Sequence, residues 1–196
     1  MEKEEMSPEL ARVHAHLCGD GSSCIWKTKE KDRKFRAVIG YYNKNQKLLD
    51  KFRSDFSKLF EVKMKMRENK EVCVKSIRIF TELRERFGDF GSRKWRIPLE
   101  IKEANKELKL EWMTAFFEDE AYHEKRYNRL KTKSVNYNGL KDIKEMLSSL
   151  NIECSLTGPN CDSSFYLTIP KFDLIRDFEG FTKEPARQAS RKALKV

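Results

Sequence analysis

Apolar residues recur along the chain with two different spacings, and the spacing changes from one segment to the next. Where they return every three or four residues the pattern predicts an amphipathic helix, and where they alternate with polar residues it predicts a half-buried strand. In the first half, the predicted helices are 8–17, 46–60 and 77–87, and the predicted strands are 24–29, 35–39, 62–67 and 72–74, with a charged turn at 30–34 between the first two strands.

A glycine-containing break at 88–91 and an extended basic segment at 92–98 follow, and the same order of elements then returns. In the second half, the predicted helices are 108–119, 140–150 and 172–178, strand-like segments flank a turn at 124–126 with the second of them at 129–135, further strands lie at 152–156 and 165–169, and a basic tail occupies 182–196. A shared order of seven elements indicates internal duplication. We therefore predict an α+β fold of two pseudo-symmetric αββαββα units, at 1–97 and 98–196.

An acidic residue closes the first helix of each unit, Asp20 in one and Glu120 in the other. The helix dipole disfavours negative charge at a helix C-terminus, so acids at both equivalent ends favour a bound cation. Mg²⁺ prefers oxygen ligands and is often held by one or two carboxylates together with phosphate. The plain alternative is that both residues are ordinary solvated acids. The pattern predicts a metal site at these two helix ends.

The composition limits the kinds of partner and the cellular location that we expect for this protein. A net charge of +10 and a pI of about 9.3 indicate a polyanionic partner, with nucleic acid favoured over an anionic membrane. No apolar run reaches about 18 residues, so we expect no membrane span, and the acidic, polar first residues do not resemble a signal peptide. The five cysteines include no CxxC pair, which argues against a zinc ribbon. We expect an intracellular protein, cytoplasmic or in a nucleoid or organelle matrix.

Two nine-residue segments carry a family resemblance. Residues 13–21 (VHAHLCGDG) and 113–121 (MTAFFEDEA) each look like a divergent LAGLIDADG motif. With the αββαββα order that follows each copy, the chain resembles the single-chain LAGLIDADG homing endonucleases over residues 7–181. The resemblance implies that the two motif helices pack together through Ala15 and Ala115. It also implies that Asp20 and Glu120, with the carbonyls of Gly19 and Asp119, hold Mg²⁺ or Mn²⁺.

The resemblance further implies a saddle of antiparallel sheets over the DNA major groove, with helices packed behind. One residue in two on each strand then faces DNA, whereas Phe35, Ala37 and Ile39 face the helices. The expected DNA-binding residues are Trp26, Thr28, Lys34, Arg36, Lys63, Lys65 and Arg67 in the first unit and Arg129, Lys131 and Lys133 in the second. The family places a basic or polar pair at the end of the second strand, near the active site. Lys133 is expected to fill this catalytic place in the second unit, where the first unit has Tyr41 and Tyr42.

The sequence thus predicts a site-specific double-strand DNA endonuclease that acts as a monomer on a long asymmetric target. Its expected partner is double-stranded DNA, with intron RNA as the partner in the rival interpretation below and no membrane. A rival interpretation is a relative without cleavage, acting as an intron RNA maturase or a DNA-binding protein. The tyrosines at Tyr41 and Tyr42 favour that rival, and the retained acids favour the enzyme. A basic structural protein with no sequence preference is a third possibility.

Overall fold

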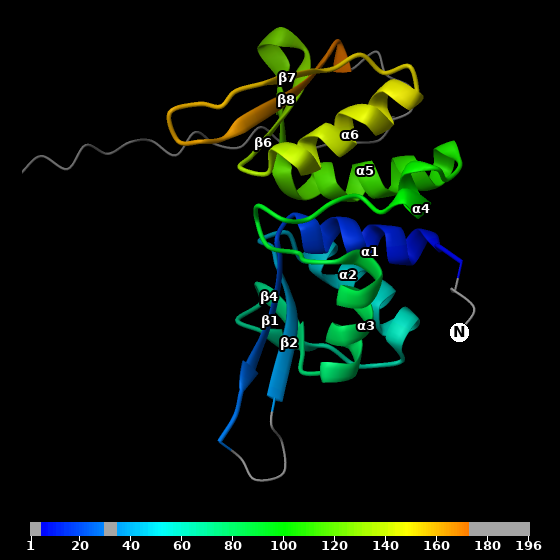
Figure 1. Ribbon diagram of the computed structural model, residues 1–196, viewed down its shortest axis with the longest axis vertical. Coiled ribbons are helices and arrows are strands. Elements are labelled where there is room, and N and C mark those ends of the chain that lie inside the picture. The colour runs from blue at the N-terminus through cyan, green and yellow to red at the C-terminus, as the bar shows by residue number, and fades with distance from the viewer. Residues whose placement is uncertain (1–4, 30–34, 173–196) are drawn as a thin grey trace, which may run out of the picture.

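The computed structural model describes residues 5–29 and 35–172, and it contains two four-stranded sheets on either side of a central pair of helices (Figure 1). In the first half the elements are α1 (Pro8–Cys18), β1 (Gly21–Lys27), β2 (Phe35–Tyr42), α2 (Gln46–Phe60), β3 (Lys65–Arg67), β4 (Glu71–Val74) and α3 (Ile77–Phe87). In the second half they are α4 (Leu99–Lys102), α5 (Lys106–Glu120), β5 (Ala121–Glu124), the 3₁₀ turn η1 (Lys125–Tyr127), β6 (Arg129–Ser134), α6 (Tyr137–Ser149), β7 (Ser155–Thr157) and β8 (Phe165–Pro170).

The two sheets share one topology. Their strand orders are β1-β2-β4-β3 and β5-β6-β8-β7, and every neighbouring pair is antiparallel. The predicted α+β fold class is therefore confirmed. The boundary after residue 97 stays a prediction.

Several element bounds differ from the sequence-based expectation. The strand expected at 62–67 begins only at Lys65, and the short helix α4 was not predicted. The helix expected from 140 begins at Tyr137, because the side chain of Asn136 accepts a hydrogen bond from the N–H of Gly139 and caps the first turn. Three expected features lie outside the described residues, namely the turn at 30–34, all but the first residue of the helix at 172–178, and the tail at 182–196.

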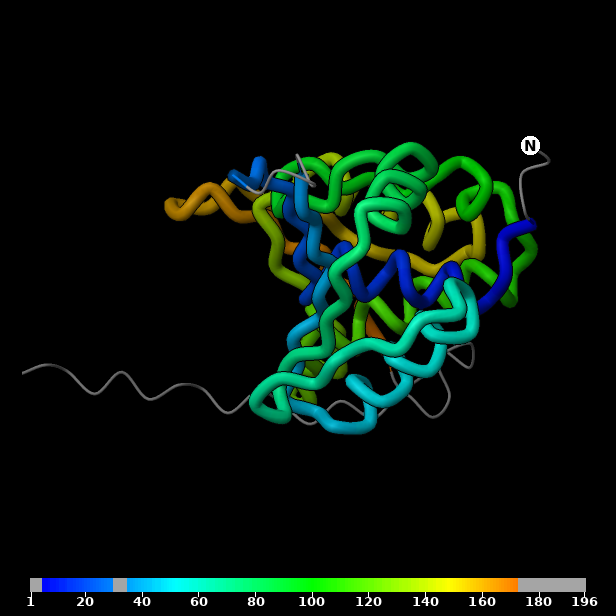
Figure 2. Tube along the Cα trace, turned by 90° about the horizontal axis from the view of Figure 1, so that it is seen from below, coloured from blue at the N-terminus to red at the C-terminus, as the bar shows by residue number. Residues whose placement is uncertain are grey.

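Helices α1 and α5 pack against each other at the centre and run in the same direction (Figure 1). Near their beginnings, Arg12 Nη1 lies 2.9 Å from Glu111 Oε2. At their ends, a Cβ added to Gly19 would lie 2.9 Å from the Cβ of Asp119. Because the contacts advance together along both helices, the two C-termini meet at one end of the pair. Figure 2 shows the helices largely to one side of the strands in a view turned by 90°.

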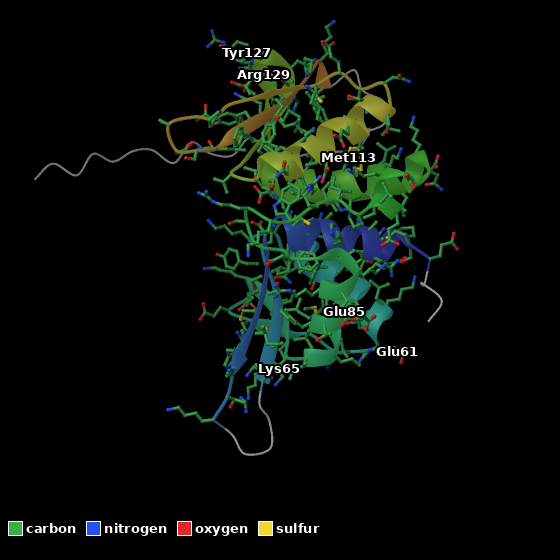
Figure 3. All side chains as sticks on the ribbon, viewed as in Figure 1. Glu61, Lys65, Glu85, Met113, Tyr127 and Arg129 are labelled. Carbon is green, nitrogen blue, oxygen red and sulfur yellow. The ribbon has the colours of Figure 1, made fainter. Side chains whose placement is uncertain are left out.

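The centre of this helix pair is fully buried. Ala15 and Ala115 are 0% and 1% exposed, and their role as the close contact between the two helices stays a prediction. In Figure 3, Met113 of α5 lies in the middle of the molecule, whereas Lys65 and Arg129 mark the two sheets toward opposite ends. Helix α5 is buried on several sides because α1 covers one side and the second sheet covers another.

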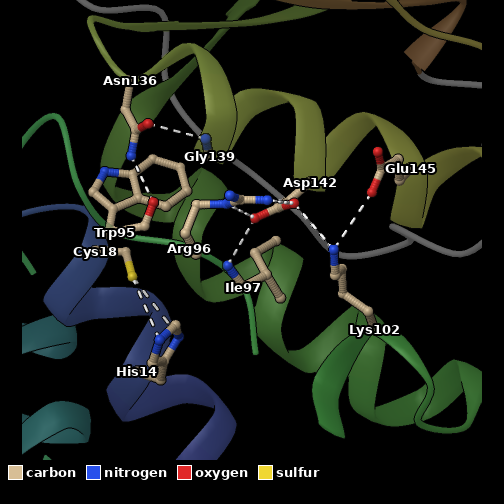
Figure 4. Close-up of polar contacts among 10 residues, drawn as sticks. All are labelled: His14, Cys18, Trp95, Arg96, Ile97, Lys102, Asn136, Gly139, Asp142 and Glu145. Carbon is tan, nitrogen blue, oxygen red and sulfur yellow. Dashed lines mark hydrogen bonds and ion pairs between the residues drawn. The ribbon is translucent and has the colours of Figure 1, made fainter. Parts of the chain in front are cut away.

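The segment between the two halves is fastened to α6 (Figure 4). Asp142, whose side chain is 1% exposed, accepts hydrogen bonds from Arg96 at 2.7 and 2.8 Å, from the N–H of Ile97 at 3.1 Å and from Lys102 at 3.1 Å. Burial alone would raise the pKa of Asp142, but these donors outweigh it and hold the pKa below the usual value. The connection therefore has a fixed path over the second half.

Candidate nuclease site at the helix ends

Each central helix runs directly into the first strand of its half. Helix α1 ends at Cys18 and β1 begins at Gly21, while α5 ends at Glu120 and β5 begins at Ala121. A Cβ at Gly21 would lie 2.3 Å from the Cα of Leu17, so only glycine fits this turn. A Cβ added to Gly19 would lie 2.9 Å from the Cβ of Asp119, so the residues that follow these two, Asp20 and Glu120, lie at the same end of the helix pair.

Hydrogen bonds connect Asp20 to the other half through Asn43. Asn43 Nδ2 lies 3.1 Å from Asp20 Oδ2, 3.2 Å from Asp119 Oδ1 and 3.1 Å from the hydroxyl oxygen of Tyr41. The Tyr41 hydroxyl donates to Asp119 Oδ1 at 2.6 Å, and His16 Nδ1 lies 2.9 Å from Asp119 Oδ2. We refer to these five residues as the junction cluster, since they join the two halves at the helix ends.

The junction cluster was not predicted, and it sharpens the expected role of Asp119. The side chains of His16 and Asp119 are 0% exposed, and Tyr41 is also 0% exposed. Both carboxylate oxygens of Asp119 are engaged within the cluster. Its predicted metal role through the backbone carbonyl remains compatible with this arrangement, whereas its carboxylate serves the interface.

Tyr41 and Tyr42 play different parts, because consecutive strand residues face opposite sides of a sheet. Tyr41 points inward with its ring stacked 4.6 Å from that of Phe52, and burial together with the charge of Asp119 raises its pKa far above the usual value. It therefore acts as a hydrogen-bond donor. Tyr42 points outward and is 47% exposed, and its N–H donates to the carbonyl of Asp20 at 3.1 Å.

The predicted catalytic residue Lys133 lies in the place that corresponds to Tyr42. Ala121 pairs with Thr132, so the next position on β6 is beside Glu120, just as Gly21 pairs with Tyr41 and Tyr42 lies beside Asp20. In the structure, Lys133 Nζ is 2.6 Å from Asp162 Oδ2. Lys133 is thus near the helix end but is paired with a carboxylate of its own half.

The strand register places most of the expected DNA-binding residues on the outer faces, by which we mean the sheet faces turned away from the helices. In the first sheet, Trp26 of β1 pairs with Arg36 of β2. The pairing continues through β4 to β3, and it puts Lys65 and Arg67 on the same face of the sheet as Arg36. In the second sheet, the alternation puts Arg129, Lys131 and Lys133 on the corresponding face, because the buried residues of β6 are Leu130 and Thr132.

Four of the residue placements differ from expectation or are not described. Thr28 follows the end of β1 and Lys63 precedes β3, so neither lies in a strand, and Lys34 lies outside the described residues. Phe35 was expected to face the helices with Ala37 and Ile39, which are indeed buried. It is 42% exposed instead, because it lies at the far end of the hairpin.

The outer faces combine cations with aromatic rings and acids. Lys131 Nζ lies 4.7 Å from the ring centre of Tyr166, and the Arg129 guanidinium lies 4.6 Å from that of Tyr127. Arg129 also pairs with Glu124, and Arg67 Nη1 lies 3.6 Å from Glu71 Oε2. These contacts hold long basic side chains in defined directions, which lowers the entropy cost of ordering them on a ligand.

The two histidines of α1 face different surroundings. His14 Nδ1 accepts a hydrogen bond from Trp112 Nε1 at 2.8 Å, and burial lowers its pKa to about 3. Cys18 lies one turn away, with its sulfur 3.7 Å from His14 Nδ1 (Figure 4). His16 is part of the junction cluster, so the two rings do not converge. Within 5–29 and 35–172, no three His, Cys, Asp or Glu side chains form a group that could hold a metal ion.

No helix in the described part of the chain is both long and apolar enough to cross a membrane. The sequence matches no family model and no curated protein.

Solved structures with the same fold match nearly the whole chain. Mesophilic variants of the homing endonuclease I-DmoI align with a TM-score of 0.65 and 20% identity, over 89% of this chain and 88% of that chain. I-DmoI in complex with DNA and Mn aligns with a TM-score of 0.64 and 17% identity, over 90% and 97%. I-SmaMI, bound to an uncleaved DNA target in the presence of calcium ions, aligns with a TM-score of 0.52 and 11% identity, over 93% and 87%.

The same fold also occurs in a protein whose name does not describe an endonuclease. Full-length DUF199/WhiA from Thermatoga maritima aligns with a TM-score of 0.52 and 11% identity, over 90% of this chain and 55% of that chain. Identities this low establish the fold and leave function to be argued from the site. The chain therefore has the fold of the single-chain LAGLIDADG homing endonucleases.

Proposed function

We propose that this protein is a site-specific double-strand DNA endonuclease of the homing type, which hydrolyses phosphodiesters with a divalent metal. One observation carries the proposal. The parallel packing of α1 and α5 brings Asp20 and Glu120 to the same end of the helix pair, flanked by the basic outer faces of two sheets. Acids and cations are thereby arranged for a metal-bound phosphate backbone.

The donor atoms at the helix ends fit a hard divalent cation. We assign the metal-binding role to the carboxylates of Asp20 and Glu120 and to the carbonyls of Gly19 and Asp119. All of these donors are oxygens, which Mg²⁺ and Mn²⁺ prefer, and their place at two helix C-termini favours positive charge. A divalent metal held by these donors would lower the pKa of a bound water and would stabilise the attacking and leaving oxygens.

The basic residues of the outer faces bind and orient DNA in this proposal. Two antiparallel sheets of this size present ribbons that fit the major groove, where base edges differ in their donors and acceptors. Most cations set the register through phosphates, and fewer read bases. We assign Lys133 to the phosphate nearest Glu120, where binding requires it to exchange Asp162 for phosphate.

The differences between the halves indicate an asymmetric target read by a single chain. The first half presents Trp26, Arg36, Lys65 and Arg67, whereas the second presents Arg129, Lys131 and Lys133 with nearby tyrosines. Unlike surfaces cannot read identical half-sites equally well. I-DmoI, which has the same fold, has been solved in complex with DNA and Mn, the two kinds of partner that this proposal requires.

A second candidate is a DNA-binding or RNA-binding protein of this fold without cleavage, such as an intron RNA maturase. The observation that favours it is the tyrosine at Tyr42, which stands where the second half has Lys133. A binding protein needs the sheets but not the acids. The two candidates therefore differ in whether Asp20 and Glu120 are required.

The experiment is a cleavage selection. The protein is incubated with a library of random double-stranded DNA and Mg²⁺ or Mn²⁺, and cut ends are sequenced. We expect one long preferred site, cut on both strands, and cutting by Asp20→Asn and Glu120→Gln that is slower by on the order of 100-fold or more. Lys58→Ala, at a side chain that is 71% exposed and paired with Glu9, is the control and should cut normally.

Binding without cutting would instead support the second candidate. If the folded wild-type protein protects a defined DNA but produces no cut ends under either metal, the endonuclease proposal is wrong. If it binds intron RNA more tightly than DNA, and Glu120→Gln promotes splicing as well as the wild type, the maturase is the better description.

A further inference from the structure

Asn43 touches acids from both halves of the molecule. It lies directly after β2, and its side-chain nitrogen is 3.1 Å from Asp20 Oδ2 and 3.2 Å from Asp119 Oδ1. Asp20 belongs to the end of the first central helix, whereas Asp119 belongs to the second. A single amide therefore spans the junction on which the proposed function depends.

The orientation of this amide is set by its other end. Asn43 Oδ1 accepts a hydrogen bond from the N–H of Asn45 at 2.9 Å, so the nitrogen must face the carboxylates. The amide has two hydrogens. One points to Asp20, and the other is shared between Asp119 Oδ1 and the Tyr41 hydroxyl. Since ionised carboxylates only accept hydrogen bonds, an amide donor between them keeps both in place.

The second half lacks this amide at the equivalent position. Because Tyr41 corresponds to Thr132 in strand register, Asn43 corresponds to Ser134. Ser134 Oγ accepts a hydrogen bond from the N–H of Asn136 at 3.1 Å, which is the same turn that Asn43 makes with Asn45. Serine makes the turn through its single hydroxyl but lacks the amide nitrogen by which Asn43 reaches the acids. The turn is shared by both halves, and the amide contact with the acid belongs to the first.

We propose that Asn43 is a positioning residue for Asp20, which fixes that carboxylate against α5 through Asp119 and so supports cleavage of one DNA strand only. This inference rests on the proposed endonuclease function, in which each acid serves one strand. Loss of the amide then slows the strand served by Asp20, and the strand served by Glu120 is cut at its usual rate.

The test replaces Asn43 by the residue that the second half uses. Asn43→Ser retains the turn to Asn45 and removes the amide. Using the target selected by the wild-type protein, the rate for each strand is measured in a single turnover with separate labels. Loss of a hydrogen bond to a charged group lowers an equilibrium constant by about 10- to 100-fold, and we expect the cleavage rate of one strand to fall by the same factor. The other strand should stay within about twofold. Asp20→Asn and Glu120→Gln, measured alongside, identify which strand belongs to which acid.

Two further measurements separate positioning from a general loss of structure. Tyr41→Phe removes a hydroxyl from the same buried cluster but leaves the Asn43–Asp20 contact, so it should not change the ratio of the two strand rates. Affinity for the target in Ca²⁺ should be within about twofold of the wild type for Asn43→Ser. If that variant does not fold, Asn43→Thr also keeps a side-chain oxygen for the turn to Asn45 and removes the amide, and the same strand should slow.

Each outcome decides a different claim. Equal slowing of both strands, slowing of the strand assigned to Glu120, or no slowing would overturn the role of Asn43 while leaving the endonuclease in place. Absence of cleavage by the wild-type protein on every DNA and metal would overturn the proposed function and this inference with it.

Discussion

The two halves of this protein have the same topology but different chemistry where their central helices end. Beside Asp20, the first half places Tyr41, Tyr42 and Asn43, whereas the second half places Thr132, Lys133 and Ser134 at the corresponding positions. The first set builds a buried polar cluster across the interface, and the second presents a cation on the surface. In a duplicated fold, equivalent backbone positions can thus carry side chains with different roles, stabilising the interface in one half and binding a ligand in the other.

The largest expected effect comes from removing the acid at the centre of the junction cluster. Asp119→Ala leaves the Tyr41 hydroxyl and His16 without their buried acceptor, and two unsatisfied buried donors cost about 3–5 kcal/mol in the free energy of unfolding. Urea denaturation measures this loss of stability. Glu111→Ala on the same helix removes an acid that is 43% exposed and paired with Arg12, so it should cost about 1 kcal/mol or less. Equal losses would mean that the cluster does not join the halves as described.

A smaller effect should appear on acidification, because α1 buries a neutral histidine beside α5. Burial, with a contribution from the charge of Arg86, lowers the pKa of His14 to about 3, and its Nδ1 already accepts a hydrogen bond from Trp112. The unfolded chain takes up this proton near pH 6.5, so stability from His14 is complete above that pH and is lost below it. Between pH 6.5 and 4.5 the loss should reach about 2–3 kcal/mol.

His14→Gln is the comparison for this pH dependence. Glutamine can accept from the Trp112 N–H but does not titrate, so the stability of the variant should fall less steeply over the same pH range. The measurement is urea denaturation of both proteins at several pH values. Parallel curves would contradict the assignment of a neutral, buried His14.

The halves also differ at a helix position that, in the second half, packs against the segment connecting the two halves. The position three residues after the capping asparagine is Leu48 in α2 but Gly139 in α6, where a Cβ would lie 2.2 Å from the ring of Trp95. Gly139→Ala should cost about 1–3 kcal/mol through overpacking. Lys141→Ala, on the exposed face of α6, should change the free energy of unfolding by about 0.5 kcal/mol or less. A neutral Gly139→Ala would show that Trp95 does not need this space.

The smallest expected effect tests the surface difference directly. Tyr42→Lys gives the first half the cation that the second half has at Lys133. One added phosphate contact should steepen the dependence of log affinity on log salt by about 0.9 and tighten DNA binding a few-fold at low salt. Binding of the selected DNA over a range of salt concentrations measures this. Tyr42→Gln adds no charge and should leave the slope unchanged. An unchanged slope in Tyr42→Lys would show that this position does not contact the DNA.

Periodicity was sufficient to predict most of the fold. The helices at 46–60 and 77–87 have their predicted bounds, because their apolar stripes are long and Asn45 and Ser76 cap them locally. The strand predicted at 62–67 was too long, since alternation of buried and exposed residues begins before the first residue that pairs with β4, which is Lys65. Hydrogen-bonded length depends on the neighbouring strand, which local sequence does not reveal.

The candidate site was predictable only in part. Acids at equivalent helix ends can be found from the duplicated order of elements, and strand parity separates outward cations from inward apolar residues. The junction cluster joins residues that are 78 and 103 positions apart along the chain, so no local pattern shows it. One signal was available, however. Tyr41 has the same parity as Ala37 and Ile39, so it had to point inward, where a tyrosine hydroxyl needs a partner.

The proposed function requires a metal-dependent cutting site at the helix ends, and removal of the metal is the simplest test of that requirement. With the selected target, EDTA should abolish cleavage by the wild-type protein and added Mg²⁺ should restore it. Asp20→Asn and Glu120→Gln should still bind that target but fail to regain cleavage when Mg²⁺ returns. Cleavage that survives metal removal, or both single variants cutting both strands at the wild-type rate, would contradict the account.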